Sequence, residues 1–218
     1  MDQKNQLSNK PDLLKDSIIK LFFQIAVPSS VGTVFMTLYN VVDTFFAGKI
    51  SAEALAALAQ TFPVYFIIIA IGVGLSIGST SLIANALGEK DTKRGSYYLA
   101  QSISLAIFTS IIVTFLGIYL GPKIILLMND SLLTMKLSME YLNIIFLGCV
   151  FIFIQMAVNS SLSAIGDTKS NRNVLIVSFF LNIVLNPLFI FGYGFIPAMG
   201  IKGIALSTIT SQALGTMY

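Results

Sequence analysis

An isolated acidic side chain, Asp43, stands in a part of the chain that otherwise lacks charge, since residues 21–42 and 44–48 contain no Asp, Glu, Lys or Arg. An unpaired carboxylate at the centre of a bilayer costs about 2.5–3.5 kcal/mol. Because burial favours the neutral form of a carboxyl group, such a residue is able to take up and release a proton, and its charged form is able to hold Na⁺. Asp43 is therefore the strongest candidate in the chain for a residue that binds a proton or Na⁺. The alternative is that it marks the outer membrane interface, because Lys49 follows soon after.

Polar side chains recur at helical spacing in three uncharged segments. The three stripes are Thr33, Thr37, Asn40 and Thr44; Gln155, Asn159 and Ser163; and Ser178, Asn182 and Asn186. Polar groups are costly in lipid, so they should face protein or a water-filled cavity. The stripes fit the lining of a solute or ion path, and they fit equally well a set of interhelical hydrogen bonds worth about 0.6 kcal/mol each.

Pro28 lies in the same segment as Asp43, about four helical turns before it. A proline removes one backbone hydrogen bond and clashes with the preceding turn, so it bends a helix. The bend is either a hinge or a static feature, because prolines are common in transmembrane helices.

Several classes of function lack the residues that they need. The chain has no His and a single Cys, Cys149, which excludes the usual zinc sites, Ser-His-Asp and Cys-His nucleophile systems and a disulfide framework. There is no G-x-x-x-x-G-K-[ST] motif for ATP, and the glycines at 72, 74 and 78 are spaced for close helix packing rather than for a dinucleotide. The net charge of +3 offers no basic cluster for nucleic acid. We expect neither an enzyme nor a cofactor beyond a coupling ion.

The distribution of charged residues along the chain predicts the helices that position these side chains. Of 218 residues, 56% are hydrophobic and 11% are charged, whereas soluble domains carry roughly 25% charged residues. Five uncharged runs of 22 to 35 residues exceed the roughly 20 that a membrane-spanning helix needs. The runs are 21–42, 54–88, 95–122, 141–166 and 173–201, followed by a shorter one at 203–218. The sequence therefore predicts an all-α, polytopic membrane protein.

The predicted organisation is a polar tail over residues 1–20 and a transmembrane lobe of six helices over residues 21–218. We expect Gly121-Pro122 to end the third helix, and the longest connection to run over residues 123–140. The last run has sixteen residues and covers about 24 Å at helical rise, which is short of the roughly 30 Å of hydrocarbon. It is predicted to be a truncated sixth span, and the chain to be a piece of a longer protein.

Positive charges set the orientation of a membrane protein, because loops rich in Lys and Arg stay in the cytoplasm. The tail and the even-numbered loops hold nine Lys and Arg residues, and the odd-numbered loops hold four. The sequence predicts a multi-pass protein of the plasma membrane with a cytoplasmic N-terminus.

Several short motifs occur in a fixed order along nearly the whole chain. They are Pro28 followed by Tyr39-Asn40-Val41-Val42-Asp43-Thr44-Phe45-Phe46-Ala47-Gly48; Leu55-Ala56-Ala57 with Phe62-Pro63; the glycines at 72, 74, 78 and 88; Gly166-Asp167-Thr168; Asn182-Ile183-Val184-Leu185-Asn186-Pro187-Leu188-Phe189-Ile190-Phe191-Gly192; and Gly200-Ile201-Lys202-Gly203-Ile204-Ala205. In this order and spacing the chain resembles the multidrug and toxic compound extrusion (MATE) family of transporters.

The resemblance implies the first half of a twelve-helix protein, in which two six-helix lobes alternate between inward- and outward-facing states and export cationic or amphipathic compounds in exchange for H⁺ or Na⁺. A C-terminal lobe, or a second copy of the chain, would complete it. The coupling residues would be Asp43, Asn182, Asn186 and Tyr141, with Pro28 as the hinge. The substrate cavity would be lined by Thr33, Thr37, Tyr39, Asn40, Gln155 and Asn159. Many relatives carry an Asp where this chain has Asn186, and an amide does not titrate, so a scheme with two titrating carboxylates does not fit this sequence.

Two alternatives to an antiporter remain open from the sequence. A flippase for lipid-linked oligosaccharides, in the same wider superfamily, is expected to line its cavity with several Arg or Lys, and the uncharged runs contain none. A non-transporting membrane scaffold would not explain why Asp43 and the polar stripes lie within membrane segments, where polar and charged groups cost free energy.

Overall fold

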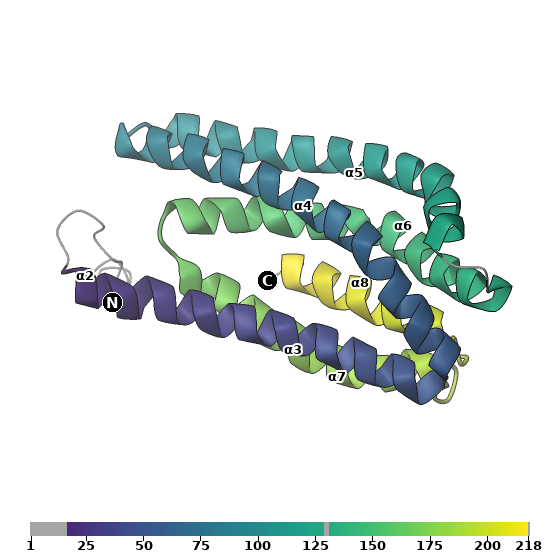
Figure 1. Cartoon of the computed structure of the whole chain (residues 1–218). Coiled ribbons are helices and arrows are strands. Elements are labelled where there is room, and N and C mark those ends of the chain that lie inside the picture. The colour runs from purple at the N-terminus through teal and green to yellow at the C-terminus, as the bar shows by residue number, and fades with distance from the viewer. Residues whose placement is uncertain (1–16, 129–130, 218) are drawn as a thin grey trace.

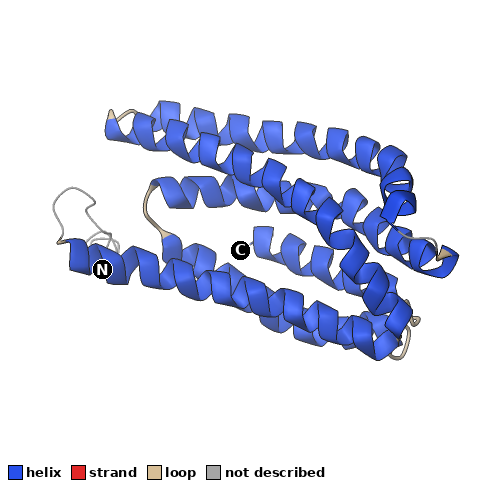
Figure 2. Ribbon diagram, in the orientation of Figure 1, coloured by secondary structure: helices blue, strands red, loops and turns tan. Residues whose placement is uncertain are grey.

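Long helices joined by short turns make up the computed structural model, which describes residues 17–128 and 131–217 (Figures 1 and 2). The elements are α2 (Ile18–Leu21), the π-helical segment η1 (Phe22–Ala26), α3 (Val27–Ile50), α4 (Ala52–Gly88), α5 (Thr92–Met128), α6 (Leu132–Ala164), α7 (Thr168–Phe191) and α8 (Ile201–Met217). Over these described ranges the only β-type pairing is an isolated bridge between Tyr193 and Ile196. The predicted all-α fold is confirmed.

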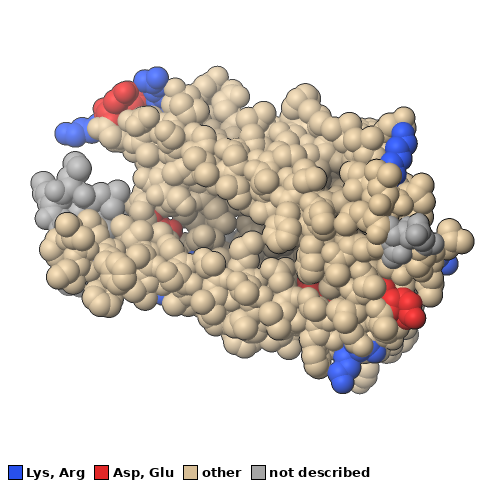
Figure 3. All heavy atoms as spheres, in the orientation of Figure 1, with Lys and Arg blue, Asp and Glu red and all other residues tan. Residues whose placement is uncertain are grey.

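Five of these helical stretches are long and apolar enough to cross a membrane, from the 33 residues of Ile18–Ile50 to the 24 residues of α7. The sixth helix, α8, has 17 residues and falls short of the roughly 20 that a span needs. Figure 3 shows the charged side chains gathered near the two ends of the molecule, with a broad uncharged band between them. This distribution is that of a membrane protein.

The helices form two groups around a buried centre. In Figure 1, α4 and α5 lie along one side, α3 and α7 along the other, and α6 and α8 lie between them. Helices α3 and α4 meet near their shared turn at Ser51 and diverge towards their other ends, and the space-filling view shows a hollow between the two groups (Figure 3). The core is richest on α6, where Leu142, Ile145 and Phe146 are almost fully buried.

The third membrane helix continues past the point where the sequence predicted its end. Helix α5 includes Pro122 and runs to Met128, so the expected end at Gly121-Pro122 and the expected connection over residues 123–140 are both wrong. Pro122 removes only one backbone hydrogen bond, and neighbouring helices readily offset that loss in a membrane protein. Packing favours continuation, because Ile125 is fully buried and Gly121 lies against the Phe146 ring.

The first helix begins earlier than predicted. The Ser17 hydroxyl accepts a hydrogen bond from the Lys20 backbone N–H at 3.4 Å, and α2 starts at Ile18 instead of residue 21. Residues 1–16 of the predicted tail lie outside the described residues. The helix therefore starts three residues before the predicted span, and the division into a tail and a transmembrane lobe stays a prediction.

Pro28 is the second residue of α3 and lies two residues after the end of the π-helical segment η1 at Ala26. Because proline has no N–H, Pro28 leaves the Gln24 carbonyl without its usual helical donor. The Thr168 hydroxyl at the start of α7 lies 3.4 Å from the carbonyls of both Gln24 and Ile25 and can donate to either. A hydrogen bond from the start of α7 therefore holds the distorted turn. The assignment of Pro28 as a hinge stays a prediction.

Gly203 is a position where α8 tolerates no side chain. A Cβ atom there would lie 2.6 Å from the Phe189 carbonyl carbon and 2.7 Å from the Ile190 backbone nitrogen of α7. We expect Gly203→Ala to lower the free energy of unfolding by about 1–3 kcal/mol, the usual cost of overpacking. Thermal unfolding in detergent measures the change.

The control is Gly74→Ala, because a Cβ at Gly74 meets no atom within 4 Å. Alanine is favoured over glycine inside a helix by about 1 kcal/mol, so Gly74→Ala should be neutral or stabilising. Equal unfolding temperatures for the two variants would contradict the close approach of α8 to α7.

Candidate functional site

Asp43 lies on the face of α3 that packs towards α7 and α8, and it is 5% exposed. The buried positions of α3 are Pro28, Gly32, Tyr39, Asp43 and Ala47. Their spacing of four or seven residues places them on one side of the helix. The carboxylate is therefore inside the lobe, about seven residues from the end of α3 at Ile50, and the alternative that Asp43 only marks the membrane interface is not supported.

The Asp43 carboxylate accepts three hydrogen bonds from two other helices. Its Oδ1 atom accepts from the side-chain amides of Asn182 at 2.9 Å and Asn186 at 2.8 Å. Its Oδ2 atom accepts from the Thr208 hydroxyl at 3.0 Å. A carboxylate offers about four lone-pair positions, so one position on Oδ2 is left. Within the described ranges, no Lys or Arg forms an ion pair with Asp43.

The two asparagines are held in place by a second layer of bonds. Both are fully buried, and their four-residue spacing on α7 puts them on one face of that helix. The Asn186 amide donates to Asn182 Oδ1 at 3.0 Å, and the Ser207 hydroxyl donates to Asn186 Oδ1 at 2.7 Å. Further hydrogen bonds therefore hold both amides that donate to Asp43 Oδ1. The open hydrogen-bonding position of the carboxylate is on Oδ2.

A pocket of about 10 Å³ lies beside Asp43, which is about the space of a single water molecule. It is lined by Tyr39, Asn40, Asp43, Leu58, Thr61, Phe62, Tyr65, Tyr141 and Thr208. The titratable groups that face it besides Asp43 are the hydroxyls of Tyr39, Tyr65 and Tyr141. The pocket suits one proton-carrying water beside a carboxyl group.

The structure brings the predicted coupling residues together. Asp43, Asn182 and Asn186 are directly bonded, and Tyr141 lines the pocket beside them. Three further residues of the site were not predicted from the sequence: Ser207 and Thr208 on α8 and Tyr65 on α4. The spacing of Ser207, Thr208 and Ser211 in the last uncharged run was a signal of a further polar face, of the same kind as the stripe on α7.

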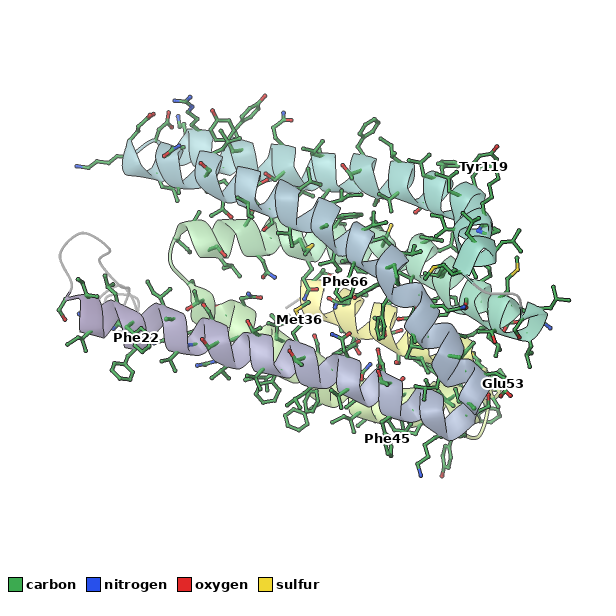
Figure 4. The ribbon with its side chains drawn as sticks, viewed as in Figure 1. Phe22, Met36, Phe45, Glu53, Phe66 and Tyr119 are labelled. Atoms are coloured by element: carbon green, nitrogen blue, oxygen red, sulfur yellow. The ribbon has the colours of Figure 1, made fainter. Side chains whose placement is uncertain are left out.

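The predicted cavity residues divide into two groups. Thr33, Thr37 and Asn40 are exposed on α3, and each side chain donates to the carbonyl four residues earlier at 3.0–3.2 Å. They line two open grooves of about 680 and 380 Å³ on α3. The exposed Phe45 ring lines the larger groove (Figure 4).

The other predicted cavity residues lie away from these grooves. Tyr39 is 8% exposed, and its hydroxyl donates to the Thr208 carbonyl at 3.4 Å. Gln155 is equally buried, close to Gly215 of α8, and Asn159 is half-buried one turn further along α6. The six residues therefore do not form one cavity within this lobe. Asn40 is the connection, because it lines both the larger groove and the pocket beside Asp43.

No group of three or more His, Cys, Asp or Glu side chains that could hold a metal ion occurs in residues 17–128 and 131–217. Asp43 is the only carboxylate of its pocket. The predicted Na⁺ site would thus rest on this carboxylate and on hydroxyl oxygens.

Comparisons with known proteins point to transporters. The MatE family model matches residues 28–188. The probable multidrug resistance protein NorM of Thermotoga maritima is 31% identical over 215 residues, covering 97% of this chain and 45% of that protein. The FAD transporter of Shewanella oneidensis is 26% identical over 205 residues, covering 94% and 45%. The chain spans about half the length of these curated relatives.

The fold is also that of a solved transporter. The outward-facing conformation of a multidrug resistance MATE family transporter of the MOP superfamily superposes with a TM-score of 0.82 at 27% identity. The superposition covers 91% of this chain and 43% of that one. The likeness is to one lobe of a protein about twice as long.

Proposed function

Because this chain belongs to the MATE family of transporters, we propose that it is the N-terminal six-helix lobe of a secondary active efflux antiporter, which exports small organic compounds across the plasma membrane in exchange for a cation. Members of the family are transporters and not enzymes. The observation that carries the proposal is the Asp43 carboxylate, buried without a cationic partner among the described residues and held by three hydrogen-bond donors. Neither a lipid-linked oligosaccharide flippase nor a scaffold is favoured by the relatives, which are multidrug and FAD transporters by name.

The proposed coupling ion is the proton. Two of the groups nearest the carboxylate are amide NH₂ groups, which donate hydrogen bonds and do not ligate cations. The pocket at Oδ2 is about 10 Å³, which is space for one water and not for an ion with several ligands. A proton needs only the single remaining lone pair.

The Thr208 hydroxyl is suited to follow the protonation of Asp43. It lies 3.0 Å from Asp43 Oδ2 and 3.0 Å from the Ile204 carbonyl, and it has one proton to give to either. When Asp43 is ionised, Thr208 donates to Oδ2. When Asp43 is neutral, its own O–H donates to Thr208, and Thr208 donates to Ile204. Protonation therefore reverses the polarity of the bond between α3 and α8 without breaking it.

The same helix carries the proposed link to the substrate. Asn40 borders both the Asp43 pocket and the larger groove on α3, and the distorted turn at Pro28 lies nearer the start of the helix. A shift of α3 on protonation would reshape the groove. Its lining of Thr37, Val41 and Phe45 suits an amphipathic organic compound, since it combines a hydroxyl with aliphatic and aromatic surface.

The proposal is tested with the full-length protein in liposomes loaded with a fluorescent organic cation. Acidifying the medium on the side that receives the substrate should drive efflux, because protons then enter as substrate leaves. An equal Na⁺ gradient at constant pH should have little effect. Efflux that follows Na⁺ alone would assign Na⁺ to the Asp43 site, and efflux that follows neither gradient would overturn the proposed antiport.

A further inference from the structure

Five buried side-chain atoms lack a hydrogen-bond partner in the part of the chain that the structure describes. They are Gln24 Oε1, Gln155 Nε2, Asn171 Oδ1, Ser211 Oγ and Gln212 Oε1. Buried polar atoms are almost always bonded, either to protein or to ordered water. A cluster of unpaired atoms in one region therefore indicates water in that region.

The unpaired atoms occupy one half of the bundle. Each belongs to the half of its helix that is nearer to the turns at residues 89–91 and 165–167. Asp43, Asn182, Asn186, Ser207 and Thr208 all belong to the opposite halves of their helices. The bonded network thus fills one half of the lobe and the unpaired groups lie in the other, which the loop charges predict to be the cytoplasmic half.

A line of polar groups connects the two halves along α8. The Tyr39 side chain lines the Asp43 pocket, and its hydroxyl donates to the Thr208 carbonyl at 3.4 Å and lies beside the Ser211 hydroxyl. The Ser178 hydroxyl donates to the Ser211 carbonyl at 3.4 Å. Tyr39 is therefore the step from the bonded network to the unpaired groups.

Gly215 continues the line one turn beyond Ser211. A Cβ atom at Gly215 would lie 3.0 Å from Gln155 Nε2 and 3.2 Å from the Ser178 hydroxyl. The missing side chain lets polar groups of α6 and α7 converge on the α8 backbone. Even one methyl group there would crowd them.

We infer that water molecules occupy this line from the Asp43 pocket past Tyr39, Ser211 and Gly215, and that they carry the coupling proton between Asp43 and the cytoplasmic side. The inference rests on the proposed proton-coupled efflux and adds a path and positioning residues to it. The line is too narrow for the organic substrate, because Tyr39, Gln155 and Ser211 are at most 8% exposed.

The proton transfer balances at each step. The Asp43 O–H bond breaks as its proton joins the water in the pocket, and that water passes one of its protons to the Tyr39 oxygen. Tyr39 gives its own hydroxyl proton to a water between Tyr39 and Ser211, that water gives one of its protons to Ser211, and Ser211 gives its proton to the water held near Gln155. Each member gains one proton and loses one. The net change is an ionised Asp43 and one proton delivered to the cytoplasmic side.

The first test is a structure of the full-length protein in lipid, at a resolution that shows ordered water. Water bonded to Ser211 Oγ, Gln155 Nε2 and Gln212 Oε1 is the expected result. If no ordered water is bonded to these atoms, or if they are bonded to one another, the proposed relay is wrong, whichever ion drives efflux.

The second test uses two variants of the line, Tyr39→Phe and Gly215→Ala. Tyr39→Phe removes a hydroxyl and keeps the ring, and Gly215→Ala places a methyl group against Gln155. Each should slow proton-driven efflux about tenfold or more, which is less than the roughly 10²–10⁴-fold that a group transferring the proton at the reacting atoms contributes. Efflux should also slow more in D₂O than it does in the wild-type protein, while substrate affinity stays unchanged. A purely structural role would lower efflux without raising the solvent isotope effect.

Matched controls are Tyr119→Phe and Gly78→Ala. Tyr119 is 66% exposed on the outer face of α5 (Figure 4), and a Cβ at Gly78 meets no atom within 4 Å. Both controls should keep the wild-type rate and isotope effect. Wild-type behaviour of Tyr39→Phe and Gly215→Ala as well would refute the relay while leaving proton-coupled efflux intact. Efflux that ignores a pH gradient in the unaltered protein refutes the coupling itself, and the proton path with it.

Discussion

Replacing Asp43 with asparagine is expected to abolish efflux while the protein still inserts and folds. Asparagine has nearly the same shape, but it cannot release a proton or carry a charge. Because Asp43 is the only carboxylate in its pocket, no neighbouring group is placed to substitute for it. Loss of an essential proton-transfer group typically costs 10²–10⁴-fold, so efflux should fall at least about 100-fold. Release of a fluorescent cation from liposomes measures the rate, and gel filtration in detergent measures folding.

The matched control is Asp91→Asn. Asp91 lies at the start of α5, where its carboxylate accepts a hydrogen bond from the Arg94 backbone N–H at 2.9 Å in an exposed turn. This control should leave efflux near the wild-type rate. A wild-type rate for Asp43→Asn would remove Asp43 from the mechanism, since the same charge is lost in both variants.

Asn186→Leu is expected to impair both stability and transport. Asn186 takes part in three hydrogen bonds, with Asp43, Asn182 and Ser207. A side-chain hydrogen bond between membrane helices is worth about 0.6 kcal/mol on average, so the loss of all three should lower the free energy of unfolding by about 2 kcal/mol. Efflux should fall more than the folded fraction does, because the Asp43 carboxylate loses one of its three donors. Equilibrium unfolding in mixed micelles and the liposome assay measure the two effects.

The comparison for this variant is Asn85→Leu, on an exposed face of α4. It makes the same chemical change outside the site and should alter the free energy of unfolding by less than about 0.5 kcal/mol, as surface substitutions usually do. If Asn186→Leu is as stable and as active as Asn85→Leu, the bonded network on α7 is not part of the coupling site.

The candidate site was partly accessible from sequence for two separate reasons. Asp43 could be identified because the cost of placing a charge in lipid depends on the local run of residues and needs no knowledge of the fold. Asn182 and Asn186 could be grouped because four-residue spacing places them on one helical face. The resemblance to a transporter family grouped them with Asp43 as coupling residues. The structure shows both amides bonded to the Asp43 carboxylate, and their coupling role stays a prediction.

The errors also have identifiable causes. Pro122 was expected to end a helix because proline lacks an N–H, but packing of Gly121 and Ile125 on α6 outweighs the loss of one backbone bond. Among the predicted cavity residues, Thr33, Thr37 and Asn40 are exposed on α3 whereas Tyr39 and Gln155 are buried, and their place in a substrate cavity stays a prediction. Spacing gives the face on which a residue lies, and it does not give the direction in which that face points.

The number and order of the membrane helices follow from the sequence alone, as does the choice of Asp43, which is the one buried carboxylate among the described residues. Those features depend on the transfer of each segment from water to lipid, which is a local property of the chain. The faces on which the helices meet are known only from the folded bundle. It is this packing that brings Thr208 and Ser207 to the Asp43 site and leaves the unpaired polar groups along α8. Hydropathy cannot supply that information, because the lipid and the interior of a helix bundle are about equally apolar, and the rotation of each helix is set by side-chain packing and hydrogen bonds across the whole bundle.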